Sequence, residues 1–333
     1  MELEYITEEE SPWRPELCRI WEQSVDLAAQ PDPFCCAPVW QLSAHRAFAP
    51  GRRVLAQHTE DSVLVLAEAF LSSGQPLLTS LEAHWLFGCP LLGPDAIGLL
   101  AEALAVMSHG YGHLPALLLG GIVPGSRRAR ELYACCESLF TIYLAGECIQ
   151  AGASLEGGLD GFLSRRSANL RSKWRKSFRR AADRGVTFER SCPTDRADAV
   201  YARMLAVEQR SWKGVGHCGM TESPAREFYA DMIRRLAAQG TARVMFARHE
   251  GQDIGFIFGG MLGPCYRGQQ FSYDAAWKDL SIGNLLQVEQ IRWLCEEGAV
   301  RYGMGTASGE PMAYKLHWTE AHPTSQTWFL QPR

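Results

Sequence analysis

The sequence lacks any spacing of cysteine and histidine that would hold a metal ion. Eleven cysteines occur singly or as adjacent pairs among 333 residues, with no C-x-x-C and no Cys/His cluster of zinc-ligand spacing. We therefore expect no metal. An odd number of scattered thiols is typical of a reduced cytoplasmic protein in which cysteine fills core space.

Long apolar runs and a large net charge are also missing. No stretch approaches the roughly 20 apolar residues that span a bilayer. The acidic N-terminus, MELEYITEEESPW, has no basic and apolar regions of a secretory signal. With 47% hydrophobic residues and a net charge of −4, the chain has the composition of a soluble globular protein. We expect a cytoplasmic location and no membrane span.

Three common catalytic signatures are absent as well. The sequence has no G-x-S-x-G, no P-loop and no Rossmann glycine fingerprint followed by an acid. Covalent hydrolase chemistry and nucleotide hydrolysis are therefore poor explanations of this chain.

What is present divides near residue 150. Residues 1–150 mix helix and strand signals without a recognisable catalytic motif, and residues 151–160, rich in Gly, Ala and Ser, are predicted to be a linker. We predict one domain over 1–150 and a second over 151–333, which the length allows.

Hydrophobic periodicity predicts the elements of both domains. In the first domain, helices are expected over 16–27, 97–107 and 126–139, with strands over 53–57, 62–71 and 114–119. In the second, helices are expected over 162–182, 194–212, 223–238 and 284–297, with strands over 186–190, 243–248, 254–261, 266–273 and 300–304. This order predicts an α/β (α+β) fold with a mixed sheet.

The segment Asp279–Asn284, DLSIGN, joins a predicted strand to a predicted helix. A helix start that contains Ser and Gly leaves backbone N–H groups and the positive end of the helix dipole available to a phosphate, and Lys278 lies beside it. The alternative is that Ser281 or Asn284 simply caps the helix.

The segment Glu208–Gly214, EQRSWKG, closes another predicted helix before a glycine-rich loop. Glu208 could accept a proton there and Trp212 could form a pocket wall. The alternative is a helix end with a partly buried tryptophan.

A basic helix opens the second domain. Arg165 to Arg180 contains eight Lys or Arg residues and no acid, while Leu170, Trp174 and Phe178 form an apolar stripe. A charge run is usually a solvated face, but a positive patch on an acidic protein also suits CoA phosphates, an acyl carrier protein, a tRNA acceptor end or an anionic lipid surface. The patch residues are Arg171, Lys173, Arg175, Lys176, Arg179 and Arg180.

A last motif lies near the C-terminus, where the apolar strand within Gly298–Gly305 is followed nine residues on by Tyr314-Lys315. This pair has two interpretations, a surface pair after a strand or part of a site.

Taken in order, these motifs resemble the GNAT superfamily in its BioF2-like, cellulose-biosynthesis acetyltransferase-like branch, which is related to the Fem-type aminoacyl transferases. The resemblance covers about residues 155–320 and rests on 167–180, 208–214, 281–286, and 298–305 with Tyr314-Lys315. More weakly, residues 32–34 and 38–40 resemble the N-terminal half of the same family. The resemblance implies tandem GNAT-like domains with a degenerate N-terminal copy.

The resemblance also implies an N-acyltransferase that moves an acyl group from acyl-CoA or acyl carrier protein to an amine of a small molecule or peptide by direct attack. Glu208, acting through water, would be the base, and backbone N–H groups near Tyr273 would polarise the carbonyl. Tyr273 or Tyr302 would protonate the thiolate, and Lys315 would support the oxyanion. The donor would bind at Lys278, Ser281, Ile282, Gly283 and Asn284. The acceptor side would be formed by Trp212, Lys213 and Tyr314.

Two departures from the family keep other functions open. Gly303 stands where relatives usually have Asp, and the phosphate signature is reduced to Ser281-Ile-Gly283. The alternative activity is an aminoacyl-tRNA-dependent, Fem-like amide-forming transferase. A binding module that has lost the chemistry is the third hypothesis.

Overall fold

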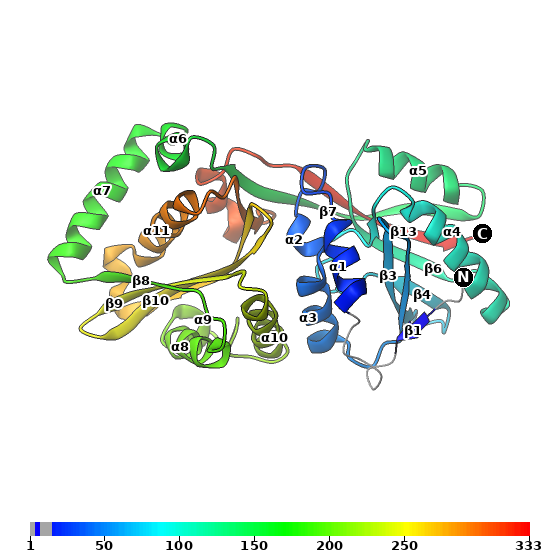
Figure 1. Cartoon of the computed structure of the whole chain (residues 1–333), viewed down its shortest axis with the longest axis horizontal. Coiled ribbons are helices and arrows are strands. Elements are labelled where there is room, and N and C mark those ends of the chain that lie inside the picture. Colours follow the sequence, from blue (N-terminus) through cyan, green and yellow to red (C-terminus); the bar gives the residue numbers. More distant parts are fainter. Residues whose placement is uncertain (1–3, 7–14) are drawn as a thin grey trace. The chain divides into compact units, whose positions relative to one another are not determined.

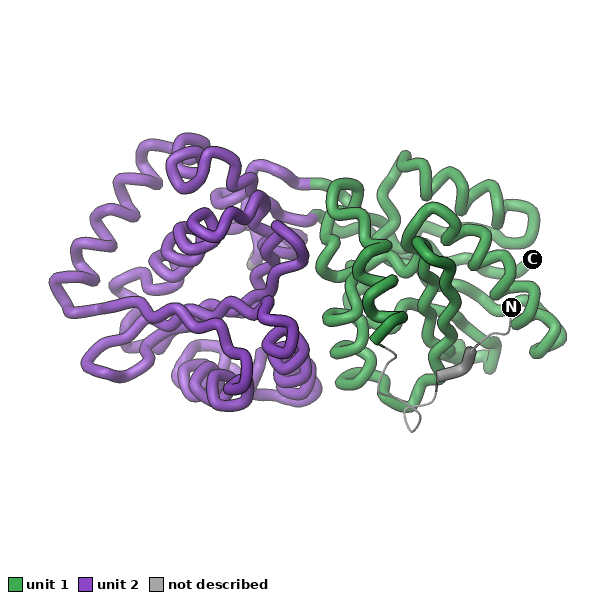
Figure 2. The backbone as a smooth tube through the Cα atoms, in the orientation of Figure 1, with its two compact units in different colours: residues 1–149, 323–333 green, residues 150–322 purple. Residues whose placement is uncertain are grey.

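The computed structural model describes residues 4–6 and 15–333, and the chain divides into two compact units (Figure 2). Unit 1 contains the chain up to Ile149 together with Pro323–Arg333, and unit 2 is Gln150–His322. The sequence-based division into 1–150 and 151–333 differs from these units at the C-terminus, where the last eleven residues pack with unit 1.

Unit 2 is built on a mixed sheet. Its strands are β8 (Thr187–Ser191), β9 (Ala242–His249), β10 (Gln252–Leu262), β11 (Cys265–Tyr273), β12 (Arg301–Thr306) and the last residues of β7 (Phe140–Ser154). Strands β8 to β11 are antiparallel neighbours in that order. Strand β12 then pairs parallel with β11 and antiparallel with β7.

Helices cover both faces of this sheet (Figure 1). One face carries α6 (Gly158–Ser164), α7 (Ala168–Asp183) and α11 (Ile282–Glu296), and the other carries α8 (Ala197–Gln209), α9 (Trp212–Val215) and α10 (Ala225–Ala238). Two 3-10 helices, η2 (Ala275–Leu280) and η3 (Glu310–His317), precede α11 and follow β12.

Unit 1 has a second mixed sheet. Its strands are β1 (Glu4–Ile6), β2 (Val54–His58), β3 (Val63–Phe70), β4 (Pro76–Thr79), β6 (Ala116–Ile122), β13 (Thr324–Pro332) and the first part of β7, with the short β5 (Leu91–Leu92) beside β3. Its helices are α1 (Pro15–Gln23), α2 (Pro33–Cys36), α3 (Pro38–Phe48), α4 (Ala96–Tyr111) and α5 (Arg127–Cys136).

The two units repeat one topology. In each, four antiparallel strands lead through a helix, α4 or α11, to a strand that lies parallel to the fourth. The parallel pairing covers three residue pairs in both cases, Leu77–Thr79 with Ala116–Leu118 and Cys265–Arg267 with Arg301–Gly303. An antiparallel strand follows on the far side, β13 in unit 1 and β7 in unit 2. The predicted fold class, a mixed α/β fold in tandem copies, is confirmed.

The copies differ where the parallel strands separate. In unit 1 the segment 81–93, which includes β5, fills this space so closely that a Cβ on Gly120 would lie 2.1 Å from the carbonyl oxygen of Leu86. A Cβ on Gly121, which has φ +66°, would lie 2.3 Å from the backbone nitrogen of Cys89. The corresponding space in unit 2 is a pocket. Because the space between β4 and β6 is filled, the described part of unit 1 lacks this pocket, which is a physical basis for calling the N-terminal copy degenerate.

Two expectations for the chain around residue 160 are wrong. The predicted linker 151–160 contains the end of β7 and the start of α6. The predicted helix 162–182 is broken into α6 and α7, because Ser167 has an extended backbone and its side chain accepts a hydrogen bond from the Leu170 N–H as the N-cap of α7.

Within the described residues, no helix is long and apolar enough to cross a membrane. All eleven cysteines lie in this part of the chain and are free thiols, several of them buried. The same residues contain no group of three or more His, Cys, Asp or Glu side chains close enough to hold a metal ion.

Candidate active site

A pocket of about 360 Å³ opens in unit 2 where β11 and β12 separate. It is lined by Trp212, Lys213, Ile257, Gly268, Gln269, Gln270, Phe271, Ser272, Tyr273, Gln287, Tyr302, Met304, Met312, Tyr314 and Lys315. Six residues selected from the sequence, on four separate elements, therefore line one cavity: Trp212, Lys213, Tyr273, Tyr302, Tyr314 and Lys315.

A β-bulge in β11 lies on the wall of this pocket. Phe258 of β10 pairs with Gln270, and the next residue, Gly259, pairs with Gly268, so Gln269 is skipped in the register. The parallel pairing with β12 ends at Arg267. A bulge bends its strand and changes the direction of its backbone groups, and Gln269, the residue skipped in the register, lines the pocket.

Lys315 reaches the pocket from η3. Its Nζ donates a hydrogen bond to the carbonyl oxygen of Thr306 at 2.7 Å, and its side chain is half-buried. The following residues anchor it, because Thr319 Oγ1 donates to the Lys315 carbonyl at 2.9 Å and Trp318 stacks on Trp174 of α7 at 4.5 Å.

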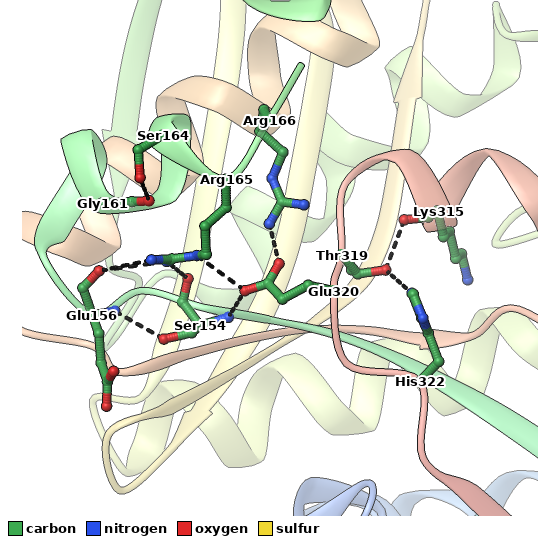
Figure 3. Close-up of polar contacts among 10 residues, drawn as sticks. All are labelled: Ser154, Glu156, Gly161, Ser164, Arg165, Arg166, Lys315, Thr319, Glu320 and His322. Atoms are coloured by element: carbon green, nitrogen blue, oxygen red, sulfur yellow. Dashed lines mark hydrogen bonds and ion pairs between the residues drawn. The ribbon is translucent and has the colours of Figure 1, made fainter.

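The segment that carries Lys315 is held further by a group of residues that we call the Glu320 cluster: Ser154, Arg165, Arg166 and Glu320 (Figure 3). The carboxylate of Glu320 accepts hydrogen bonds from the Ser154 N–H at 2.8 Å and from Arg166, and lies 3.3 Å from Arg165 Nε. The Arg166 side chain is only 4% exposed, so its charge depends on this carboxylate.

The tyrosines of the pocket differ in environment. Tyr302 is fully buried, donates a hydrogen bond to Gln287 Oε1 and stacks on Tyr266 at 5.2 Å. Burial raises the pKa of Tyr302 well above its ordinary value and raises the pKa of Tyr314 to about 12. Both are therefore neutral phenols at physiological pH. Tyr273 is half-buried and lies beside Gly283 at the start of α11.

Lys213 is presented by α9, which begins because the Ser211 side chain accepts hydrogen bonds from the Lys213 and Gly214 N–H groups. The Nζ of Lys213 donates to Gln270 Oε1 at 2.7 Å and to the carbonyl oxygen of Phe271 at 2.9 Å. Burial lowers the pKa of Lys213, and the nearby Glu208 and Cys218 oppose that shift.

Glu208 is not among the residues that line the pocket. Its side chain is fully buried, and Oε1 accepts a hydrogen bond from the Met220 N–H at 3.2 Å. Gly219, at φ +93°, passes so close that a Cβ there would lie 2.5 Å from Oε1. The carboxylate of Glu208 thus organises the loop after α9, and the structure does not bring it to the substrate side.

The predicted donor site lies at the N-terminus of α11. Ser281 is in the left-handed conformation, φ 58°, and makes no side-chain cap hydrogen bond; the Asn284 N–H donates to its carbonyl oxygen at 2.9 Å. Ile282 and Gly283 are buried, and a Cβ on Gly283 would lie 3.0 Å from the Phe271 ring. Lys278 is exposed on η2. The first turn of α11 is therefore closed by the Ser281 carbonyl oxygen, and the Ser281 side chain does not cap it.

The basic helix runs next to this site. Arg180 donates a hydrogen bond to the carbonyl oxygen of Asp279 at 3.1 Å, so the end of α7 contacts the turn before α11. Most of the patch is exposed (Lys173, Arg175, Lys176, Arg179 and Arg180), and Arg171 is half-buried. The apolar stripe predicted for this helix faces the core, with Trp174 buried and Leu170 and Phe178 packed beside it.

Several pocket residues were missed by sequence reasoning. Gln269, Gln270 and Gln287 carry no motif; the only signal was a pair of polar amides within an apolar strand. Arg267 of β11, which is not among the residues that line the pocket, was missed too. It is buried, and a Cβ on Gly305, at φ +73°, would lie 2.5 Å from its guanidinium. The glycine at 305 is therefore required by the arginine that occupies the adjacent space.

Residues 164–316 match a family model described as Acetyltransferase (GNAT) domain. The chain also resembles three solved structures in fold. FemX is 12% identical with a TM-score of 0.65, covering 100% of this chain and 98% of FemX. L-PGS from Bacillus licheniformis is 13% identical with a TM-score of 0.61, covering 98% and 93%. A conserved protein of unknown function from Bacteroides thetaiotaomicron is 10% identical with a TM-score of 0.59, covering 95% and 92%. No curated protein sequence matches the chain.

The domain match covers every residue that lines the pocket, including both Lys213 and Lys315. This match indicates an enzyme of the acyltransferase class, and the matched residues lie in unit 2. The solved structures show that this fold extends over the whole chain.

Proposed function

We propose that this protein is an N-acyltransferase of the BioF2-like branch that transfers an acyl group from a thioester to an amine of a small molecule or peptide by direct attack. One observation carries the proposal: a single pocket at the separated parallel strands contains Lys315 and the bulge at Gln269. Tyr273, which lines this pocket, lies beside Gly283 at the start of α11. A donor phosphate site, a place for a reacting carbonyl and a cation are thus available together.

The donor, acyl-CoA or acyl carrier protein, is held through its phosphates by the backbone at Ile282 and Gly283 and by Lys278, because the Ser281 and Asn284 N–H groups already donate to backbone carbonyl oxygens. Gly283 allows Phe271 and Tyr273 to lie against the helix start, since a side chain there would contact both rings at 3.0 to 3.3 Å. The acyl group then extends along β11 into the pocket.

The reaction follows from the lining. The amine, placed between Trp212 and Tyr314, attacks the thioester carbonyl, whose developing negative charge is stabilised by Lys315 and the backbone of the bulge. Tyr273 protonates the thiolate; Tyr302 is held as a donor to Gln287 and supports the pocket wall. Because Glu208 is sealed from the cavity, we do not assign it the proton-accepting role that the sequence suggested.

Thermal stability with ligands tests the donor. Acetyl-CoA, a long-chain acyl-CoA and free CoA, each at millimolar concentration, are added in a melting experiment. At about 100 times its dissociation constant a ligand contributes roughly 2.7 kcal/mol, so we expect an increased Tm with CoA and a further increase with the acyl chain that fits the pocket. No increase with any of the three would contradict a CoA donor.

The alternative, aminoacyl-tRNA-dependent transfer, is favoured by one observation, the exposed cations of α7 beside the donor site. If tRNA or an acyl carrier protein docks there, changing Lys173 and Lys176 to Glu should weaken its binding by tenfold or more. The slope of the logarithm of the binding constant against the logarithm of the salt concentration should become shallower by about one to two. Arg19→Glu on α1, an exposed arginine of unit 1, is the matched control. Affinity that is flat with salt and unchanged in the double variant would exclude this docking site.

A further inference from the structure

We propose that Lys213 is the general base of the transfer reaction, accepting the proton that the attacking amine loses. This inference rests on the proposed function, because it assigns a residue to the chemistry of the same pocket. The sequence suggested only that Lys213 contacts substrate.

The hydrogen bonds of Lys213 fit a neutral amine. Its Nζ donates to Gln270 Oε1 at 2.7 Å and to the Phe271 carbonyl oxygen at 2.9 Å. A neutral –NH₂ group has two hydrogens, so both are used in these bonds and the lone pair is left to accept a proton. A protonated –NH₃⁺ group would have a third hydrogen to satisfy. Both acceptors belong to β11, the strand that lines the pocket.

The charged and titratable groups around Lys213 come from every element packed against it. Glu208 on α8 and Cys218 in the following loop favour its protonated form, whereas burial disfavours it and is the larger effect. Lys315 from η3 lines the same cavity, and a like charge opposes protonation of Lys213. Tyr273, Tyr302 and Tyr314 also line the cavity. Among the residues that line this pocket none is a carboxylate or an imidazole, so Lys213 is the group there best suited to accept a proton.

The use of lysine in this chain supports the assignment independently. Of 33 Lys and Arg residues only five are lysines: Lys173, Lys176, Lys213, Lys278 and Lys315. Two of the five line the pocket. Arginine stays protonated at any physiological pH, whereas a buried lysine can lose its proton. A chain that otherwise uses arginine thus has a titratable amine at Lys213.

The step balances without another reactant. As the nitrogen of the acceptor forms its bond to the thioester carbon, Lys213 Nζ takes one proton from that nitrogen. The C–S bond then breaks, and the thiolate is protonated by Tyr273, which regains a proton from Lys213. The products are an amide and a thiol, and Lys213 returns to its neutral form.

Two variants separate this role from substrate anchoring. Lys213→Arg has a permanent positive charge and cannot accept a proton, and Lys213→Met keeps the length of the side chain without a titratable group. We expect both to reduce kcat by a factor of about 10² to 10⁴, with Tm close to wild type in at least one. An anchoring role would instead preserve activity in the Arg variant and increase KM in the Met variant. Arg activity within threefold of wild type would overturn the proposal.

A measurement without turnover tests the same point. Protein grown with ε-¹³C-lysine should give five lysine signals, and Lys213→Arg identifies the one from Lys213. We expect the pKa of Lys213 to be lower than those of the other four by one unit or more, and a smaller difference would overturn the proposal. Because no donor is needed, this result is independent of whether the thioester assignment is correct.

Discussion

Replacing Lys315 by alanine is expected to reduce kcat by a factor of about 10² or more while leaving Tm nearly unchanged. The expected loss is that of one preorganised charge at a developing oxyanion. The Nζ of Lys315 lies 2.7 Å from the Thr306 carbonyl oxygen, whereas the segment is held mainly by Trp318 and Glu320. We therefore expect a large decrease in kcat and little change in Tm.

The control for this variant is His317→Ala, an exposed residue of the same 3-10 helix that does not line the pocket. Both variants are compared with wild type in steady-state turnover and in thermal melting. A control with full activity and a Lys315→Ala protein with low kcat and an unchanged KM would place Lys315 in the transition state. Unchanged turnover in Lys315→Ala would remove it from the mechanism.

The residues of the pocket could be predicted in part because each stands at a junction that sequence patterns mark. Trp212 and Lys213 follow a helix end, Tyr273 ends a strand of a predicted meander, and Lys315 follows a short apolar strand. Glycine and proline residues, and the points where a hydrophobic periodicity ends, mark such junctions in the sequence. That they meet in one cavity depends on the parallel pairing of β11 and β12, which no local pattern encodes.

The two strands β7 and β13 could not be predicted, and with them the composition of the units. Most of β7 is exposed or half-buried on both faces, so it lacks the apolar and polar alternation that indicates a strand. Its small residues read as a linker, yet Gly152 and Ala153 pair with Gly303 and Tyr302 of β12. Strand β13 pairs with β6 and β7, which precede it by more than 170 residues.

The misplaced role of Glu208 has a similar origin. A carboxylate next to Trp212 and Lys213 in the sequence is a reasonable base, but α8 turns its last residues inward at Ser211. The loop 216–220 then closes over the carboxylate through the Met220 N–H. Side-chain direction at a helix end is decided by tertiary packing, which the sequence pattern does not show.

The Glu320 cluster carries the second large expected effect, on stability. In Glu320→Ala the Arg166 guanidinium, 4% exposed, would lose its anionic partner, and the Ser154 N–H would lose its acceptor. Removing one partner of a buried pair costs about 3–5 kcal/mol. Since Glu320 itself is 33% exposed, screening reduces the expected cost to about 2–4 kcal/mol, which corresponds to a decrease in Tm of roughly 5–10 °C.

Glu156→Ala is the matched control, because this glutamate lies in the same group of contacts but offers Arg165 only its backbone carbonyl (Figure 3). Its substitution should change the free energy of unfolding by less than about 0.5 kcal/mol. Denaturant unfolding of the two variants measures the difference. Because Lys315 lies five residues before Glu320 on the anchored segment, Glu320→Ala should lower both Tm and kcat, whereas Lys315→Ala should lower kcat alone. Equal stability of Glu320→Ala and Glu156→Ala would show that the cluster does not hold the segment in place.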